Sequence, residues 1–371
     1  MMGAQYGKGR QSGIDILRLA CAVAVMLFHF GFRGYTADGL LDARFPELAR
    51  VAKYGWAGVE IFFMISGYVI YDSVRMKTVK SFLYGRAVRI FPTLWLCAAI
   101  TATVVFLLEA TRFYIGRHDV PGNLVLWVPF DGYSYQMIDG AYWSLVLELQ
   151  FYAMVAVVVA ALGRDALLPS LSFLVLINLL LKICVPEAAF PERWLCGAYV
   201  GFFGIGAALR CLSTRRDMAH SSLLLLVSVV SAVFYTTQKV QYVETHYETW
   251  LNGWYVAAIL VFGAIILVVD TLYDLVPRSL SSFAAVAGGV TYPLYLLHQN
   301  IGYTILNEIF SHRNRWVGLA LTVAAVFVLA VAVYYLFDRP VRRYLMTRGS
   351  SLRDPVLDRS GKAVRSANSN A

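Results

Sequence analysis

The feature that most constrains this chain is the recurrence of apolar runs, each about 20 residues long, along most of its length. A run of that length is what an α-helix needs to cross the hydrocarbon core of a bilayer. Hydrophobic residues make up 59% of the 371 positions and charged residues only 15%, whereas a soluble domain is about a quarter charged. The alternation of apolar and polar residues typical of barrel strands is missing. The sequence therefore predicts an all-α, polytopic membrane helical bundle.

We expect about ten transmembrane helices in this bundle. Their ranges are 14–34, 55–73, 88–110, 141–162, 167–185, 194–212, 219–237, 251–270, 283–308 and 316–337. Residues 1–340 are predicted to form one integral membrane domain, and residues 341–371 a basic cytoplasmic tail that is partly disordered. We expect no cleavable signal peptide, because the first apolar run is too long and lacks a cleavage site.

Charge and cysteine content exclude several classes of protein. The net charge is +9, which in a membrane protein reflects basic cytoplasmic loops more often than nucleic-acid binding. The five cysteines have neither disulfide-framework nor zinc-ligand spacing. We therefore expect no nucleic-acid partner and no metal site, and we interpret the cysteines as small buried hydrophobes.

The distribution of lysine and arginine predicts the orientation. With ten spans, both termini lie on the same side of the membrane, and the loops on that side hold roughly twice as many Lys and Arg residues as the opposite loops. Since cytoplasmic loops carry the excess of positive charge, both termini are predicted to be cytoplasmic.

The first span carries an arginine and a histidine, Arg18 and His29. A charged side chain at mid-membrane costs about 2.5–3.5 kcal/mol on insertion scales, so each needs a reason. Eleven residues are close to three helical turns, which places both side chains on one helix face about 16 Å apart. The competing interpretations are an arginine that reaches the interface and a histidine with a purely structural hydrogen bond.

Two arginines open the third span. Arg86 and Arg89 are three residues apart and therefore neighbours on a helix surface. At a helix N-terminus, two guanidiniums and unpaired N–H groups would bind phosphate. Ordinary positive charge of a cytoplasmic loop is the alternative.

Further ionisable residues lie inside other spans, at Glu60, Glu148 and His298. Glu148 shares a helix face with Ser144 and Tyr152. His298 shares one with Thr291 and Tyr295, and it reaches nearly the same depth as His29, about 22 Å from the start of its span. Two histidines at one depth suggest a site, although a structural ion network is the competing interpretation.

These motifs together resemble the acyltransferase 3 family of integral membrane acyltransferases. The matching residues, in chain order, are Asp15, Arg18 and His29; the segment GVEIFFMISG with Glu60; Arg86 and Arg89 followed by Pro92; Trp143, Ser144, Leu145, Glu148, Phe151 and Tyr152; and Tyr292, Tyr295 and His298. The family commonly has Asp where this chain has Glu60.

The resemblance implies a bacterial inner-membrane enzyme that transfers an acyl group from cytoplasmic acyl-CoA to a hydroxyl of an extracytoplasmic acceptor. Acetyl is the favoured acyl group, and succinyl is the second choice. Arg18, Arg86 and Arg89 would bind the CoA phosphates. His29 would be the general base, oriented by Glu60 or Glu148. Donors to the thioester oxyanion would be Tyr295, His298 or Ser144.

No permanently bound cofactor is expected, and the partners are acyl-CoA, the acceptor and the lipid bilayer. The acceptor stays open among surface polysaccharide, lipid-linked glycan, peptidoglycan and a small secreted metabolite, with a surface glycan such as exopolysaccharide or O-antigen favoured. The alternative functions are a proton-coupled secondary transporter or flippase, since intramembrane His and Glu relay protons, and a non-enzymatic membrane scaffold. The absence of internal repeats weighs against the transporter.

Overall fold

The computed structural model describes residues 11–36, 39–126, 136–185, 195–310 and 314–349. Its described residues form helices and connecting segments without strands, as the sequence predicts. The long helices are α1 (Ser12–Phe28), α4 (Ala57–Arg75), α5 (Val79–Leu107), α7 (Trp143–Leu162), α8 (Leu167–Cys184), α10 (Val200–Ser213), α11 (Met218–His246), α12 (Gly253–Tyr273), α13 (Ser281–Thr304) and α14 (Arg315–Val333).

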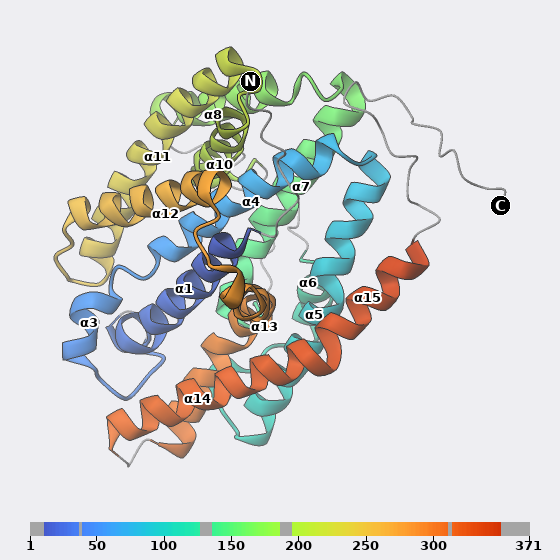
Figure 1. Ribbon diagram of the computed structural model, residues 1–371. Coiled ribbons are helices and arrows are strands. Elements are labelled where there is room, and N and C mark those ends of the chain that lie inside the picture. Colours follow the sequence, from blue (N-terminus) through green and yellow to red (C-terminus); the bar gives the residue numbers. More distant parts are fainter. Residues whose placement is uncertain (1–10, 37–38, 127–135, 186–194, 311–313, 350–371) are drawn as a thin grey trace, which may run out of the picture.

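Shorter elements complete the described chain. A π-helical turn, His29–Arg33, and α2 (Gly34–Thr36) extend α1, and a second π-helical turn, Ile305–Ile309, extends α13. A third, Tyr334–Asp338, joins α14 to α15 (Arg339–Arg348), so that these segments form one continuous rod (Figure 1). The remaining helices are α3 (Pro46–Ala52), α6 (Val120–Val125) and the 3-10 turns Thr111–Phe113, Arg117–Asp119, Gly140–Tyr142, Gly197–Tyr199 and Arg278–Leu280.

Nine helical segments of the described chain are long and apolar enough to cross a membrane. The remaining expected span, 194–212, corresponds to the apolar segment Gly197–Ser213, which is shorter than these nine. Several helices extend beyond the expected ranges. For example, α5 begins at Val79 instead of 88, and α11 ends at His246 instead of 237. Hydropathy detects only the apolar stretch of a helix, whereas the helix itself continues through polar turns at its ends.

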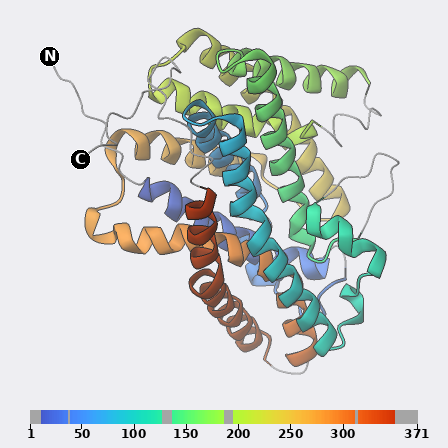
Figure 2. The ribbon, with the colours of Figure 1, turned by 90° about the vertical axis from the view of Figure 1, so that its right-hand side faces the viewer.

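The helices pack around a centre formed by α1, α4 and α13 (Figure 1). Helices α8, α10 and α11 gather on one side, while α5, α14 and α15 lie on the other, an arrangement also visible after rotation (Figure 2). Large apolar side chains face outward on the long helices, among them Val261, Phe262 and Ile265 on α12. In water such a surface would be unfavourable, but in a bilayer it is the face that lipid covers. The chain is thus a multi-pass membrane protein.

We define the proximal end of the bundle as the end where α1 begins, and the distal end as the end where α1 meets His29. At the proximal end, Asp270 of α12 accepts hydrogen bonds from the backbone N–H groups of Gly13 and Ile14, at 3.0 and 3.1 Å. These groups have no partner inside α1 because they belong to its first turn. A carboxylate from another helix therefore caps α1.

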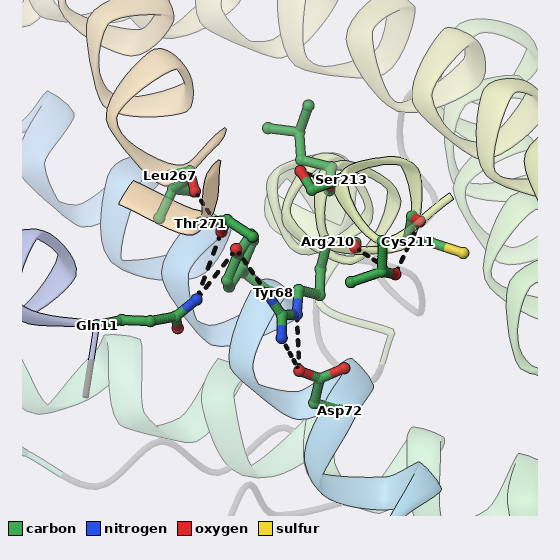
Figure 3. A network of polar contacts seen from close by, with 10 residues as sticks. Gln11, Tyr68, Asp72, Arg210, Cys211, Ser213, Leu267 and Thr271 are labelled. Carbon is green, nitrogen blue, oxygen red and sulfur yellow. Dashed lines mark hydrogen bonds and ion pairs between the residues drawn. The ribbon is translucent and has the colours of Figure 1, made fainter. Parts of the chain in front are cut away.

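A polar network ties four helices together beside this cap (Figure 3). The side chain of Gln11 reaches Tyr68 of α4 and Thr271 of α12, and Arg210 of α10 donates to Tyr68 and to Asp72. The Arg210 Nε to Asp72 Oδ2 distance is 2.6 Å. The network fixes the start of α1 against its neighbours.

Candidate active site

Two histidines from helices far apart in the sequence meet near the distal end. His29 follows α1 directly and His298 lies on α13, and His29 Nδ1 is 2.9 Å from His298 Nε2. Their residues are only 5% and 1% exposed. The expectation that both histidines lie at one depth is confirmed, because α1 and α13 pack side by side in the same direction.

The hydrogen-bond network fixes the tautomer of each ring. His298 Nδ1 lies 2.8 Å from the carbonyl oxygen of Tyr295, and a carbonyl only accepts, so Nδ1 carries the proton. The neutral ring then has its lone pair on Nε2, which accepts from His29 Nδ1–H. His29 Nε2 is consequently left with a lone pair. This chain of contacts makes His29 Nε2 the basic atom of the pair.

Arg33 is the neighbour of that basic atom. Its Nη1 lies 3.5 Å from His29 Nε2, which is the outer limit of a hydrogen bond and leaves the lone pair weakly engaged. The π-helical turn His29–Arg33 sets this position, and such turns frequently occur at functional sites. Our sequence interpretation missed Arg33, although its spacing of four from His29 was a signal.

The loop before α7 holds the distal end of α13. Asp139 Oδ2 accepts from the backbone N–H of Asn300 at 2.9 Å, and the Asn300 amide donates to the carbonyl of Ile138 at 2.8 Å. One turn earlier on α13, Tyr295 and Ser144 share a hydrogen bond of 2.7 Å between their hydroxyls. These contacts fix the segment that carries His298. They also occupy the hydroxyls of Tyr295 and Ser144, two of the three expected oxyanion donors.

Two connected cavities run from the proximal end toward the histidines. The proximal cavity, of about 300 Å³, is lined by Gln11, Ile14, Asp15, Arg18, Val69, Arg89, Gly288, Gly289, Tyr292, Asp338 and Arg342. The central cavity, of about 90 Å³, shares Arg18, Arg89, Gly288 and Tyr292 with it and extends to Ser144 and Tyr295. The ring centre of Tyr295 is 5.6 Å from that of His298. The central cavity therefore ends at Tyr295, the neighbour of His298, and neither histidine is among its lining residues.

Three arginines were expected to bind the donor, and the structure places them differently. Arg18 and Arg89 both line the two cavities, and Arg18 forms an ion pair of 3.1 Å with Asp15. Arg86 is not among the residues that line either cavity; it donates to Ser73 at 2.8 Å. Its role as a donor-binding residue stays a prediction.

The expected position of these arginines at a helix N-terminus was wrong. The helix α5 begins at Val79, capped by the Thr78 side chain, so Arg86 and Arg89 lie about two turns and more inside it. At that depth the backbone N–H groups are already paired within the helix. These backbone N–H groups are therefore not free to bind phosphate, and only the guanidinium groups would be.

Glu148 lies in the central cavity among the arginines. It accepts from Ser66 at 3.1 Å and from the hydroxyl of Tyr152, and its charge acts on Arg18 and Arg89. The expected shared face of Ser144, Glu148 and Tyr152 is thereby confirmed in geometry. Within the described residues, however, the ring nitrogens of His29 contact His298 and Arg33. The position expected for Glu148 or Glu60 beside His29 is thus taken by His298.

Glu60, the other candidate carboxylate, lines a separate cavity at the distal end together with Lys239. Across the described chain, no cluster of three or more His, Cys, Asp or Glu residues is arranged to hold a metal ion. The candidate site is therefore a buried histidine pair near two arginine-lined cavities, and Glu60 lines a different cavity.

Fold and site define a polytopic membrane protein with a buried histidine pair. The chain belongs to the acyltransferase 3 family, whose model, described as an acyltransferase domain, matches residues 11–339. It is thus a multi-pass membrane protein of an acyltransferase family.

Curated relatives are similar over parts of the chain. "Nodulation protein 10" of Rhizobium leguminosarum bv. viciae is 28% identical over 40% of this chain and 44% of its own length. "Putative O-acetyltransferase SAS0844" of Staphylococcus aureus (strain MSSA476) is 25% identical over 43% of this chain and 26% of its own. "Putative peptidoglycan O-acetyltransferase YrhL" of Bacillus subtilis (strain 168) is 24% identical over 89% and 54%.

The chain thus spans about a quarter to about half of the length of these relatives. No solved structure matches it significantly.

Proposed function

We propose that this chain is an O-acyltransferase that moves an acyl group from cytoplasmic acyl-CoA to a hydroxyl of an extracytoplasmic acceptor. Acetyl is the favoured acyl group, and succinyl is the second choice. The observation that carries the proposal is the histidine pair, whose hydrogen bonds leave the lone pair of His29 Nε2 available. An unprotonated imidazole can accept the proton of an acceptor hydroxyl as a general base. The names of two relatives as O-acetyltransferases support acetyl as the group and oxygen as its acceptor.

The donor would enter at the proximal end. Arg18, Arg89 and Arg342 line the proximal cavity, and guanidinium groups match phosphate geometry, so they would bind the CoA phosphates. The pantetheine arm would follow the central cavity toward His298. At about 90 Å³ that cavity is smaller than the roughly 300 Å³ of a typical ligand pocket. Entry of the arm therefore requires lining side chains such as Phe62 and Tyr292 to move.

The reaction would proceed as a direct transfer. His29 Nε2 takes the proton of the acceptor hydroxyl while the hydroxyl oxygen attacks the thioester carbonyl carbon. A C–O bond forms, the C–S bond breaks, and the CoA sulfur leaves with the electron pair. The imidazolium returns the proton to that sulfur, which leaves an acyl ester, free CoA and a neutral histidine. Arg33, beside His29 Nε2, would stabilise the negative charge that develops on the thioester oxygen.

Glu148 would act as a positioning residue. It lines the central cavity with Arg18 and Arg89, and its carboxylate offsets their repulsion. Without it, two guanidiniums would lie in a low-dielectric cavity with less compensation, which is costly.

The acceptor would be a bacterial surface glycan, and the membrane the cytoplasmic one with both termini inside. The relative named as a peptidoglycan O-acetyltransferase supports a glycan. The excess of Lys and Arg on the proximal side supports the orientation. A transporter that carries the glycan instead is the alternative.

The test uses the full chain in lipid nanodiscs with radiolabelled acetyl-CoA and a bacterial glycan fraction. We expect label to appear in the glycan as an alkali-labile ester, together with free CoA. Label that stays in acetyl-CoA, combined with glycan uptake into proteoliposomes, would contradict the proposal and favour the transporter.

A further inference from the structure

A third cavity lies at the distal end, between α4, α8, α10 and α11. Its volume is about 360 Å³, and the residues used below, Trp56, Glu60, Lys182, Tyr199, Tyr235, Thr236 and Lys239, are part of its lining. This distal cavity shares no lining residue with the proximal and central cavities. Its size falls in the range of small-molecule sites, about 300–1,000 Å³.

The distal cavity collects buried polar atoms that the described chain leaves without a partner. The indole Nε1 of Trp56, the carboxylate Oε2 of Glu60 and the hydroxyl of Thr236 are buried and make no hydrogen bond there. Trp56 and Glu60 are only 5% and 3% exposed. Leaving such groups unpaired is unfavourable, and structures retain them mainly where a ligand or another role accounts for them.

The chemistry of the lining favours a hydroxylated, uncharged ring. Glu60 accepts hydrogen bonds, and Lys182 and Lys239 donate them, so that an anion would meet the carboxylate and a cation the two ammonium groups. A hydroxyl both donates and accepts, and it therefore fits between both kinds of group. The rings of Tyr199 and Tyr235 offer apolar faces of the kind that combine with a few polar groups in small-molecule sites.

The distal cavity lies near the histidine pair. Its lining residue Trp56 belongs to the same apolar cluster as Phe28 and Phe32, and the ring centre of Phe28 is 5.4 Å from that of His29. The charge of Arg33 acts on Lys239 in the cavity, and Arg33 Nη1 lies 3.5 Å from His29 Nε2. On the same side, Glu60 acts electrostatically on Tyr295, the residue whose carbonyl binds His298. A ligand in the cavity would therefore lie on the distal side of the basic atom, opposite the two arginine-lined cavities.

We propose that the distal cavity binds a neutral sugar ring of the acceptor and presents its hydroxyl to His29. This inference rests on the proposed acyl transfer for its biological meaning, but binding itself is testable without it. Glu60 is then an acceptor-binding residue, on the far side of the histidines from the donor, and not the residue that orients His29.

The test measures binding of methyl glycosides of glucose, galactose and N-acetylglucosamine to the full chain in nanodiscs, free of glycoside detergents. Saturation-transfer NMR detects weak ligands, and the anionic methyl glucuronide is the comparison. We expect at least one neutral glycoside to bind, and methyl glucuronide to bind more weakly. Trp56→Phe keeps an aromatic ring but removes the N–H together with the five-membered ring of the indole, and Glu60→Gln removes the charge. Each should weaken binding about tenfold.

Matched controls on the same end of the bundle are Trp250→Phe and Glu109→Gln, which change exposed residues outside the cavity lining and should leave binding unchanged. Where a glycoside is also acylated, Trp56→Phe should raise the KM for the sugar and shift that for acyl-CoA less than twofold. Binding that ignores both cavity variants, or no neutral glycoside bound, overturns the inference. Glycoside binding that depends on Trp56, without any acyl transfer, supports the cavity and overturns the proposed function instead.

Discussion

At the scale of single residues, the site depends on a chain of hydrogen bonds that joins one backbone carbonyl and two imidazole rings. The carbonyl of Tyr295 holds the His298 proton, His298 accepts from His29, and His29 presents its remaining nitrogen. A buried imidazolium is costly without compensation, so the pair stays neutral until a substrate supplies a proton. The neighbouring cation Arg33 reinforces that neutrality. In our proposal, this neutral imidazole accepts the proton of the acceptor hydroxyl.

We predict that His29→Gln abolishes most of the transfer. Glutamine keeps a polar group of similar length but has no titratable nitrogen, and general-base catalysis contributes about 10²–10⁴-fold. The measurement is the initial rate of acetyl transfer with thermal melting as a check on folding. His220→Gln, on an exposed histidine paired with Asp217, is the control. A folded His29→Gln enzyme with near-normal turnover would remove His29 from the mechanism.

A second prediction separates the two arginines of α5. Arg89 lines both cavities, whereas Arg86 contacts Ser73. Arg89→Gln should therefore raise the KM for acyl-CoA about tenfold or more, since a charge-assisted contact contributes about 1.5–3 kcal/mol. Arg86→Gln should have the smaller effect. Equal losses in both variants would mean that Arg86 reaches the donor after a rearrangement.

At the scale of helices, the position of α1 depends on its cap. Asp270 binds the N–H groups of Gly13 and Ile14, and Arg18, one turn further along, binds the donor in our proposal. We predict that Asp270→Ala lowers stability by roughly 0.5–2 kcal/mol, the usual range for loss of a helix cap. Thermal unfolding in nanodiscs measures this. Asp165→Ala, which removes an exposed carboxylate 3.8 Å from Arg75, should melt like the wild type.

Helices α4 and α10 approach each other closely enough that only glycine fits at their contact. A Cβ on Gly206 would overlap the carbonyl oxygen of Met64, and one on Gly67 would overlap that of Phe203. Small residues permit such backbone approach in membrane bundles. We predict that Gly206→Ala reduces the yield of folded protein and its melting temperature. Gly253→Ala, at a position with open space around it, is the matched control and should behave normally.

The sequence was sufficient for some of these features and insufficient for others. Helix periodicity placed His29 and His298 at one depth because rise per residue is constant, and a shared depth needs no tertiary information. Helix periodicity did not predict which cavity Glu60 lines, because the neighbours of a residue on α4 depend on how that helix is rotated against α8 and α11. Arg33 was missed although residues four apart are neighbours on a helix surface, because the expected span was interpreted only through Arg18 and His29. The start of α5 was misplaced because its first turns are polar.

At the scale of the whole molecule, the cavities divide the bundle into two chemical ends. The proximal cavity is lined by three arginines and two aspartates, and the distal cavity by one glutamate, two lysines and aromatic rings. The histidine pair lies between the ends of these two environments. An anionic nucleotide and a neutral sugar would thus approach the same base from opposite faces of the membrane.

This division leads to the last prediction, that donor and acceptor act from opposite sides. The central cavity suits a slim pantetheine arm better than a sugar, whose unpaired hydroxyls would cost roughly 1–3 kcal/mol each. In sealed vesicles of known orientation, transfer should occur when acyl-CoA is supplied on the proximal side and acceptor on the distal side. Arg89→Gln should reduce the rate from the proximal side, and Trp56→Phe should raise the KM for the acceptor on the distal side. Equal transfer with both substrates on the proximal side would contradict this arrangement and favour acylation in the cytoplasm followed by separate export.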